Sequence, residues 1–402
     1  MERLPNNPFL KNVRDYGRKR VISVFGVFIC VLIIVTLICS PVSSAETKKT
    51  TSDSSVTIVD DWGRTVTLDK PAERIAFSHT AAGEGVLLAG GWDKVIGRDG
   101  SLIDSEFYPN LDLIPAISTQ NQPFSLDFEK ITQLKPDLVI LQKYYSQREG
   151  FEEIAKNLEP DIPVVGLDFL EPGSAESIKK LGILLGTSDV ADEYVQFHDE
   201  VINSIKEKTH DLAEEKKPNV FIDGGGMGTD QISTYGKEAS FWENMCEIAG
   251  GKNVASSLPG DRVKTVDLEW LLEQDIDAIV AQVYYEKGKP SGTGVSKSFG
   301  YQATDPVHAS EEADAIITDI KNIDVYADSD AVKNNNVYLQ HWQLANNPKA
   351  FIGTAYLAKW LHPDLFKDLD PEQIHQEYLT RFIGSDYNLK NTGIFGYPND
   401  TQ

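Results

Sequence analysis

Two pairs of tyrosines carry the clearest chemistry in this sequence. Tyr144 and Tyr145 follow a short run rich in Val, Ile and Leu, and Tyr284 and Tyr285 follow a similar run. In open α/β sheets, ligands bind beyond the carboxyl ends of the strands. There a tyrosine ring offers packing surface, and its phenol offers a hydrogen bond or an oxygen donor for ferric iron. Either pair alone is also explained as ordinary, half-buried aromatic residues at a strand end.

The two tyrosine pairs belong to a longer internal repeat. Residues 127–145 align without a gap with residues 267–285, at an offset of 140 residues, and 6 of the 19 positions are identical. Ser125 and Thr265 precede the two copies, and we expect them to cap the helices that follow. Solenoid repeats recur every 20–50 residues or so, and this interval therefore indicates two similar lobes. The tyrosines would then line opposite walls of one cleft.

Further candidate ligand-binding side chains lie in loops after predicted strands. His79 and His341 each follow such a strand directly, where an imidazole can meet a ligand, although a loop histidine bonded to the backbone is the simpler interpretation of either alone. The other candidates are polar, cationic or aromatic residues of similar loops: Arg98, Gln120, Met227, Arg262 and Trp342. If the protein holds a metal directly, the predicted donors are His79, Tyr144, Tyr284 and His341.

Composition and missing motifs exclude several functions. The net charge of -23 makes a nucleic-acid-binding protein improbable. Cys246 is the one cysteine beyond the N-terminal segment, which excludes an internal disulfide and a cysteine-based zinc site, and its apolar surroundings predict a core position. No nucleophile elbow, HExxH motif or phosphate-binding loop occurs. We therefore expect a protein that is not an enzyme and has no cofactor of its own.

The N-terminal segment predicts export. Basic residues between Lys11 and Arg20 precede 19 uncharged residues, 21–39, and small residues lead to Ala45. This order is that of a signal peptide, while the length of the apolar run also suits a membrane anchor. Cys39 as a lipidated residue is a weaker alternative. We expect residues 1–45 to be the signal peptide or anchor, residues 46–55 a flexible tether, and the remainder to lie at the cell surface or in the periplasm.

Short apolar runs alternate with helical patterns in the remainder, which predicts an α/β fold with largely parallel sheets. An amphipathic helix is expected from Ser188 to Glu215, capped by Ser188 or Asp189, and it would connect the lobes. The predicted divisions are an N-terminal lobe over 56–187, the connecting helix over 188–217, a C-terminal lobe over 218–385 and a tail over 386–402. The predicted strands are 74–78, 137–142, 163–167, 219–223, 277–282 and 336–340.

Glu129 and Glu269 occupy equivalent positions of the repeat, each in the first turn of a predicted helix. A helix dipole favours a carboxylate there, which is an ordinary explanation for both. Equivalent glutamates on two lobes would also form a symmetric pair of negative charges. A two-fold symmetric partner with two arginines would fit them.

Several motifs taken together resemble the solute-binding proteins of ABC importers for iron-siderophore, haem and cobalamin. The resemblance covers roughly residues 56–385 and includes a departure: relatives often have Ser-Pro-Ala-x-Thr-Glu where residues 78–84 read Ser-His-Thr-Ala-Ala-Gly-Glu. That histidine allows for a different ligand. The motifs that carry the resemblance are residues 60–68, 70–75, 87–97, 128–140, 249–254, 332–338 and 357–366.

The resemblance implies two Rossmann-like lobes joined by one long helix, with the ligand in the cleft and limited hinge motion. It implies delivery to a dimeric ABC permease, with Glu129 and Glu269 docking on permease arginines. We expect a monomer that captures an iron(III) complex, a siderophore or haem, or a corrinoid. Molybdate, tungstate or a bare metal ion is the alternative ligand, and an exported α/β enzyme is the less favoured alternative class.

Overall fold

The computed structural model describes residues 55–398, apart from 104–106, 121, 145–146, 171, 225–230, 238–240, 260–262, 285–295, 304–305, 385–386 and 392. The chain divides into Met1–Ser52 and Asp53–Gln402, and the described residues all belong to the second unit. The expected signal or anchor over 1–45 and nearly all of the tether lie outside the described residues. Within the described part, no helix is long and apolar enough to cross a membrane.

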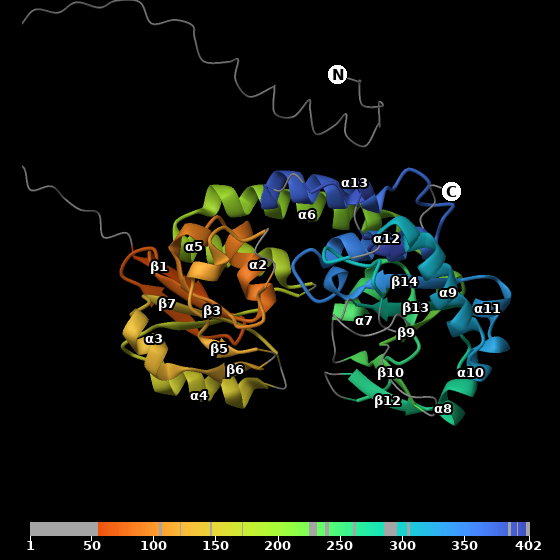
Figure 1. Cartoon of the computed structure of the whole chain (residues 1–402), viewed down its shortest axis with the longest axis horizontal. Coiled ribbons are helices and arrows are strands. Elements are labelled where there is room, and N and C mark those ends of the chain that lie inside the picture. Colours follow the sequence, from red (N-terminus) through yellow and green to blue (C-terminus); the bar gives the residue numbers. More distant parts are fainter. Residues whose placement is uncertain are drawn as a thin grey trace, which may run out of the picture. The chain divides into compact units, whose positions relative to one another are not determined.

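The N-terminal lobe is built on a parallel sheet of four strands in the order β4-β3-β7-β8 (Figure 1). Every residue of β3, β7 and β8 is buried, as expected for parallel strands with both faces covered. The helices of this lobe are α2 (Thr80–Leu88), α3 (Phe128–Leu134), α4 (Arg148–Leu158) and α5 (Ser174–Leu185). Its strands are β3 (Ile75–Ser78), β4 (Val95–Gly97), β7 (Leu138–Gln142) and β8 (Val164–Leu167).

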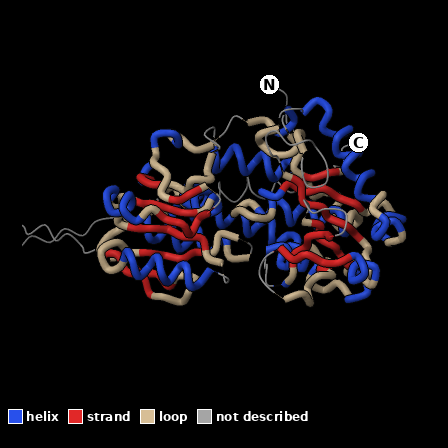
Figure 2. Tube along the Cα trace, turned by 60° about the horizontal axis from the view of Figure 1, so that its bottom comes forward, coloured by secondary structure: helices blue, strands red, loops and turns tan. Residues whose placement is uncertain are grey.

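The C-terminal lobe has a second sheet in the order β11-β9-β13-β14-β15, and Figure 2 shows the two sheets as separate groups of strands. Strand β15 pairs antiparallel with β14, while the other pairs are parallel. The expected tail over 386–402 therefore contributes an edge strand to this sheet. The strands are β9 (Asn219–Asp223), β11 (Lys252–Asn253), β13 (Ala278–Val283), β14 (Val337–His341) and β15 (Gly396–Tyr397).

Helices cover the second sheet as they cover the first, as expected for an α/β protein. The buried Cys246 belongs to α7, in agreement with its predicted core position. The helices of this lobe are α7 (Phe241–Ile248), α8 (Leu268–Leu272), α9 (Ala309–Lys321), α10 (Asp324–Ala327), α11 (Asp330–Lys333), α12 (Ala350–Leu361) and α13 (Pro371–Tyr378).

The internal repeat corresponds to one structural unit in each lobe. An antiparallel ribbon, β5-β6 (Ser118–Thr119 and Gln122–Leu126) or β10-β12 (Gln231–Tyr235 and Val263–Asp267), precedes α3 or α8. The prediction that Ser125 and Thr265 cap these helices was wrong, because both residues lie inside the ribbon strands. The caps are the aspartates two residues later: Asp127 accepts from the Lys130 amide at 2.9 Å, and Asp267 accepts from the Trp270 amide at 2.8 Å.

Helix α6 (Ser188–Thr209) is the predicted connecting helix, but it is shorter than expected. It ends at Thr209, and a short 3₁₀ turn over Glu214–Lys216 follows. Thr187 is the N-cap residue in place of Ser188 or Asp189, and its hydroxyl donates to the Ala89 carbonyl at 2.6 Å. The segment after α13 also packs on α6, since the Phe382 ring lies 5.6 Å from the Tyr194 ring.

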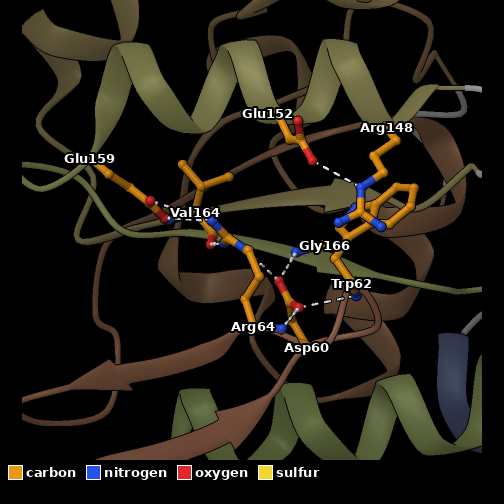
Figure 3. A network of polar contacts seen from close by, with 8 residues as sticks. All are labelled: Asp60, Trp62, Arg64, Arg148, Glu152, Glu159, Val164 and Gly166. Carbon is orange, nitrogen blue, oxygen red and sulfur yellow. Dashed lines mark hydrogen bonds and ion pairs between the residues drawn. The ribbon is translucent and has the colours of Figure 1, made fainter.

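The first hairpin, β1 (Val56–Val59) and β2 (Thr65–Leu68), is fixed to β8 by a buried carboxylate (Figure 3). Asp60 accepts from the amides of Trp62 and Arg64 at 3.0 and 2.8 Å, and from Arg64 Nε at 3.1 Å. The same guanidinium donates to the Val164 carbonyl and to Glu159. Residues 60–68 are one of the motifs that carry the resemblance, and these bonds give that motif a structural role within the N-terminal lobe.

Candidate functional site

A cavity of about 1060 Å³ is lined by residues of both lobes. Its walls combine aromatic rings with side-chain amides, and its charged members lie at the floor or in the N-terminal wall. The N-terminal lobe contributes His79, Thr80, Glu84, Asp99, Ser101, Leu102, Ile103, Phe107, Tyr108, Gln120 and Pro123. The C-terminal half contributes Gln282, Tyr284, Phe299, Tyr301, Gln302, His341, Trp342, Gln343, Asn346, Asn347, Lys349, Tyr378, Leu379 and Ile383.

The structure brings five of the predicted ligand-binding residues into this lining: His79, Gln120, Tyr284, His341 and Trp342. Tyr144 is not in the lining but lies one hydrogen bond behind it, because its phenol oxygen is 2.8 Å from His79 Nε2. The remaining candidates Tyr145, Met227, Arg262 and Tyr285 lie outside the described residues.

Arg98 does not line the cavity. Its Nε donates to the carbonyls of Leu111 and Ile114 at 3.2 and 3.0 Å, and its Nη1 donates to those of Asp99 and Leu102 at 3.0 and 3.2 Å. These bonds hold the loop beside the cavity in place. The sequence indicates only that Arg98 follows a strand. It does not indicate that backbone carbonyls accept all of these hydrogen bonds from its guanidinium.

His79 caps α2 with an unusual geometry. Its φ is 85°, its Nδ1 accepts from the Ala81 amide at 3.1 Å, and its own amide donates to Asp99 Oδ2 at 2.9 Å. Burial lowers the pKa of the imidazole to about 4, against the opposing pull of the Asp99 charge. His79 is therefore neutral at physiological pH.

Asp99 is a buried carboxylate, and both of its oxygens accept hydrogen bonds. Oδ2 accepts from the hydroxyls of Ser118 and Ser78 at 2.7 and 3.1 Å, and Oδ1 accepts from the Ser101 amide at 2.7 Å. Burial alone would raise the pKa of this carboxyl, but the hydrogen bonds from Ser118, His79 and Ser101 outweigh it and hold the pKa below its ordinary value. The charged Asp99 side chain thus fixes the orientation of the His79 backbone through the hydrogen bond from its amide.

A second group of buried imidazoles lies in and behind the C-terminal wall. His341 ends β14, and burial lowers its pKa to about 3, with Lys349 adding to the effect. His375 is buried as well, and its Nε2 lies 2.6 Å from the Tyr301 hydroxyl. The Phe395 ring packs against both imidazoles, with centroids 5.4 and 4.5 Å away. The Nδ1 atoms of both histidines have no hydrogen-bond partner among the described residues.

The cavity floor contains a buried ion pair that the sequence did not reveal. Glu84, from α2, is 3 % exposed and Lys349, just before α12, is 4 % exposed. Lys349 Nζ contacts one oxygen of the Glu84 carboxylate, and the Tyr378 hydroxyl donates to the other at 2.6 Å. Lys349 and Tyr378 lie 265 and 294 residues beyond Glu84, which is why no local pattern could connect them. The cluster ties α2 of one lobe to α12 and α13 of the other.

Glu129 and Glu269 are exposed, and each lies in the first turn of its helix as predicted. In Figure 1, α3 and α8 lie in different lobes, and both are remote from α6. Glu129 accepts a 3.2 Å hydrogen bond from Gln133 of the same helix. Neither glutamate lines the cavity, so both carboxylates are available on the outer surface.

Comparison with known proteins gives the chain a class. The sequence profile of the periplasmic binding protein family matches residues 75–343. The molybdate-binding protein MolA of Haemophilus influenzae is 23% identical over 369 residues, which cover 84% of this chain and 91% of that protein. Its molybdate-bound structure aligns with a TM-score of 0.59 at 19% identity, over 83% of this chain and 99% of that one.

A second structure aligns more closely. The TroA-like periplasmic binding protein FepB of Veillonella parvula gives a TM-score of 0.70 at 24% identity, over 85% of this chain and 99% of that one. The expected α/β fold with two lobes is confirmed. The chain belongs to the periplasmic binding protein family. It is the extracytoplasmic substrate-binding component of an ABC importer and not an enzyme.

The buried ion pair gives a prediction about stability. Lys349→Met leaves the Glu84 carboxylate buried without its cation, and we expect the free energy of unfolding to fall by roughly 3–5 kcal/mol. Combining it with Glu84→Gln should restore most of that loss, because no charge then remains buried. Denaturant unfolding of the purified chain measures both.

Glu152→Ala is the matched control for this comparison. Glu152 pairs with Arg148 at 2.9 Å on the surface, with side chains 61% and 62% exposed (Figure 3). An exposed pair contributes about 1 kcal/mol or less. If Lys349→Met costs no more than Glu152→Ala, the Glu84 cluster does not hold the lobes together.

Stability should also fall as the pH drops from about 6.5 toward 4. The pKa values of His79, His341 and His375 lie below 6.5 in the folded protein, so the unfolded chain binds about three more protons in this range. Asp168 opposes them, because burial raises its pKa to about 6 and the folded state then holds one more proton. Burial also raises the pKa of Glu372, which opposes them further, so the net uptake on unfolding is about one to two protons. Unfolding free energies at pH 7 and pH 5 measure this slope.

Asp168→Asn tests whether Asp168 opposes the histidines in the pH dependence of stability. It removes the opposing proton, so the loss of stability between pH 7 and pH 5 should be steeper than in the parent chain. Equal stability of the parent chain at the two pH values would contradict neutral, buried imidazoles.

Proposed function

We propose that this protein captures a bulky metal chelate, an iron(III) siderophore or haem, or a corrinoid, and delivers it to a dimeric ABC permease. The observation that supports this most is the cavity between the lobes. Its volume of about 1060 Å³ matches the upper end of the roughly 300–1,000 Å³ of pockets that take drug-sized ligands. Rings from both lobes, such as Tyr108 and Trp342, offer packing surface on opposite walls.

The charges of the described lining also favour a chelate. Glu84 is paired with Lys349, and Asp99 is surrounded by hydrogen-bond donors, so the described charged groups are already compensated within the protein. The C-terminal wall also carries neutral polar side chains, among them the amides of Gln282, Gln302, Gln343, Asn346 and Asn347. Such a lining suits a ligand whose metal charge is already balanced by its own oxygen donors.

Molybdate or another small oxyanion is the second candidate ligand. It is favoured by the similarity to MolA over most of the chain, although identity at this level supports the fold more than the ligand. A small anion would need positive donors that close on it. Lys349 is the described cationic group of the lining, and the ion pair with Glu84 occupies its amine.

A ligand panel separates these candidates. Ferrichrome, ferric enterobactin, hemin, cyanocobalamin, sodium molybdate and nickel chloride would each be titrated by calorimetry and by thermal unfolding. At 100 times its Kd, a ligand stabilises the folded state by about 2.7 kcal/mol. We expect one or more of the four chelates to bind and molybdate to leave the unfolding transition unchanged. Binding of molybdate alone would replace the chelate proposal.

We also propose that Glu129 and Glu269 dock the protein on the permease, one from each lobe. Two observations support this docking role. The two glutamates are exposed at equivalent positions of the repeat, and the family acts outside the cytoplasm with a permease. The apolar segment over 21–39 would hold the protein at the membrane, or direct its export, near that permease. Charges at the rim of an interface contribute mainly to encounter and orientation.

Docking is tested by Glu129→Ala combined with Glu269→Ala. We expect uptake of the bound chelate by cells to fall at least about 10-fold while the Kd for the chelate stays within about 2-fold, because neither side chain lines the cavity. Glu149→Ala with Glu311→Ala is the matched control, since these are also exposed glutamates in the first turns of α4 and α9. A loss of chelate binding in the test pair would place those residues at the ligand site.

A further inference from the structure

His79 holds a backbone conformation that its side chain disfavours. A residue with a Cβ at φ 85° is strained by about 1–3 kcal/mol, and such strain persists only where the surroundings enforce it. Here Asp99 Oδ2 binds the His79 amide, while the Ala81 amide binds the ring. The strained residue also lines the ligand cavity. Strain at a residue of the lining is a reason to look for a role of this imidazole in the cleft.

The internal repeat shows what the other lobe has at this position. Strand β7 pairs Leu141 with Ser78, and the repeat partner of Leu141, Ala281 of β13, pairs with Asp223. The residue after Asp223 is Gly224, which is therefore the counterpart of His79. The N-terminal lobe carries an imidazole where the C-terminal lobe carries no side chain. His79 thus makes the two walls of the cleft chemically different.

Its hydrogen bonds determine which ring nitrogen carries the proton. Nδ1 accepts the Ala81 N–H, so its lone pair is occupied and it holds no hydrogen. A neutral imidazole must then carry its hydrogen on Nε2, which donates to the phenol oxygen of Tyr144 at 2.8 Å. The two rings also make a T-shaped contact, with centroids 5.4 Å apart. Neither nitrogen offers a free lone pair toward the cavity.

A metal ion bound by His79 would require one of those lone pairs. Binding at Nε2 would displace its hydrogen and the bond to Tyr144, and binding at Nδ1 would break the cap of α2. The neighbouring carboxylate of Asp99 is already engaged by Ser78, Ser118 and Ser101. Among the described residues no group of three or more His, Cys, Asp or Glu side chains could hold a metal ion.

We propose that His79, held in place by Tyr144 behind it, is a specificity-determining residue that withholds metal-binding lone pairs, so that its side of the cleft accepts a metal only inside a complete chelate. This inference rests on the proposed function, and it selects the chelate over the bare metal ion. It also removes His79 from the residues that could bind metal directly and makes Tyr144 the residue that positions the imidazole.

Two substitutions separate the cap from the contact with Tyr144. His79→Asn keeps a side-chain oxygen that can cap α2, and asparagine tolerates a positive φ, but its shorter side chain does not reach Tyr144. Tyr144→Phe removes the acceptor and leaves the cap intact. Tyr284→Phe is the matched control, because Tyr284 is the repeat counterpart of Tyr144 in the other lobe.

The probes are nickel chloride and whichever of the four chelates binds most tightly in the ligand panel. We expect the parent chain to bind the chelate at least about 100-fold more tightly than Ni²⁺. His79→Asn and Tyr144→Phe should each weaken chelate binding about 10-fold, and the double variant should lose no more than either single one. His79→Asn combined with Tyr284→Phe should instead show the product of the separate losses. Unchanged chelate affinity in His79→Asn, with a less stable fold, would leave His79 only a structural cap and overturn the proposal.

The ring itself supplies an independent test. Long-range ¹H–¹⁵N correlation of the imidazole in the full chain, assigned by its loss in His79→Asn, should show hydrogen on Nε2 and none on Nδ1. Hydrogen on Nδ1, or Ni²⁺ binding that disappears in His79→Asn, would overturn the proposal. If no chelate binds at all, the proposed function fails, while the tautomer and the Ni²⁺ titration still decide the role of His79.

Discussion

The cleft of this protein depends on one buried carboxylate, Glu84. It lies on α2 of the N-terminal lobe, yet both of its partners, Lys349 and Tyr378, belong to the other half of the chain. Removing a carboxylate and an ammonium from water is costly unless each finds its partner with good geometry. The lobe arrangement that satisfies Glu84 is therefore strongly favoured over one that separates it from Lys349. The same three side chains line the floor of the cavity, so the site and the lobe contact share one set of interactions.

This arrangement changes the expected role of the connecting helix. Helix α6 is one link between the lobes, and the segment after α13 adds a second contact surface against it through Phe382. The Phe107 ring of the N-terminal lobe also lies 4.6 Å from the Tyr301 ring of the other. A cleft held at its floor, along its helix and by such aromatic contacts has few ways to open widely. These contacts agree with the limited hinge motion that the resemblance to known binding proteins implies.

Local patterns in the sequence predicted most of the framework. Buried parallel strands such as β7 and β13 are continuous apolar runs, and the repeat that joins them to α3 and α8 can be read directly from residues 127–145 and 267–285. Features that depend on neighbours far along the chain were not predicted. Lys349 is an ordinary lysine in the sequence, and only the fold brings it to Glu84. The start of α6 was predicted one or two residues late because no side chain caps it, and the Thr187 hydroxyl donates instead to the distant Ala89 carbonyl.

The same distinction between local patterns and distant contacts applies to the predicted site residues. Tyr284 and His341 were predicted to lie in the cleft because they end strands, and strand ends meet at one edge of a parallel sheet. Arg98 also follows a strand, but backbone carbonyls of its own loop take up its guanidinium before any ligand could. The sequence shows which residues reach the edge of the sheet. Which of them remain available there depends on hydrogen bonds formed by the loops.

The strong negative charge of the chain does not extend into the described lining of its cleft. Glu84 is matched by Lys349, Asp99 is compensated by surrounding donors, and the described imidazoles are kept neutral by burial. The exposed carboxylates Glu129 and Glu269 lie instead on the outer surface. Under the proposed function, compensated charge inside and negative charge outside would separate the two tasks of a binding protein. The cavity can hold a ligand by packing and neutral hydrogen bonds, while the surface can meet a cationic partner without disturbing that ligand.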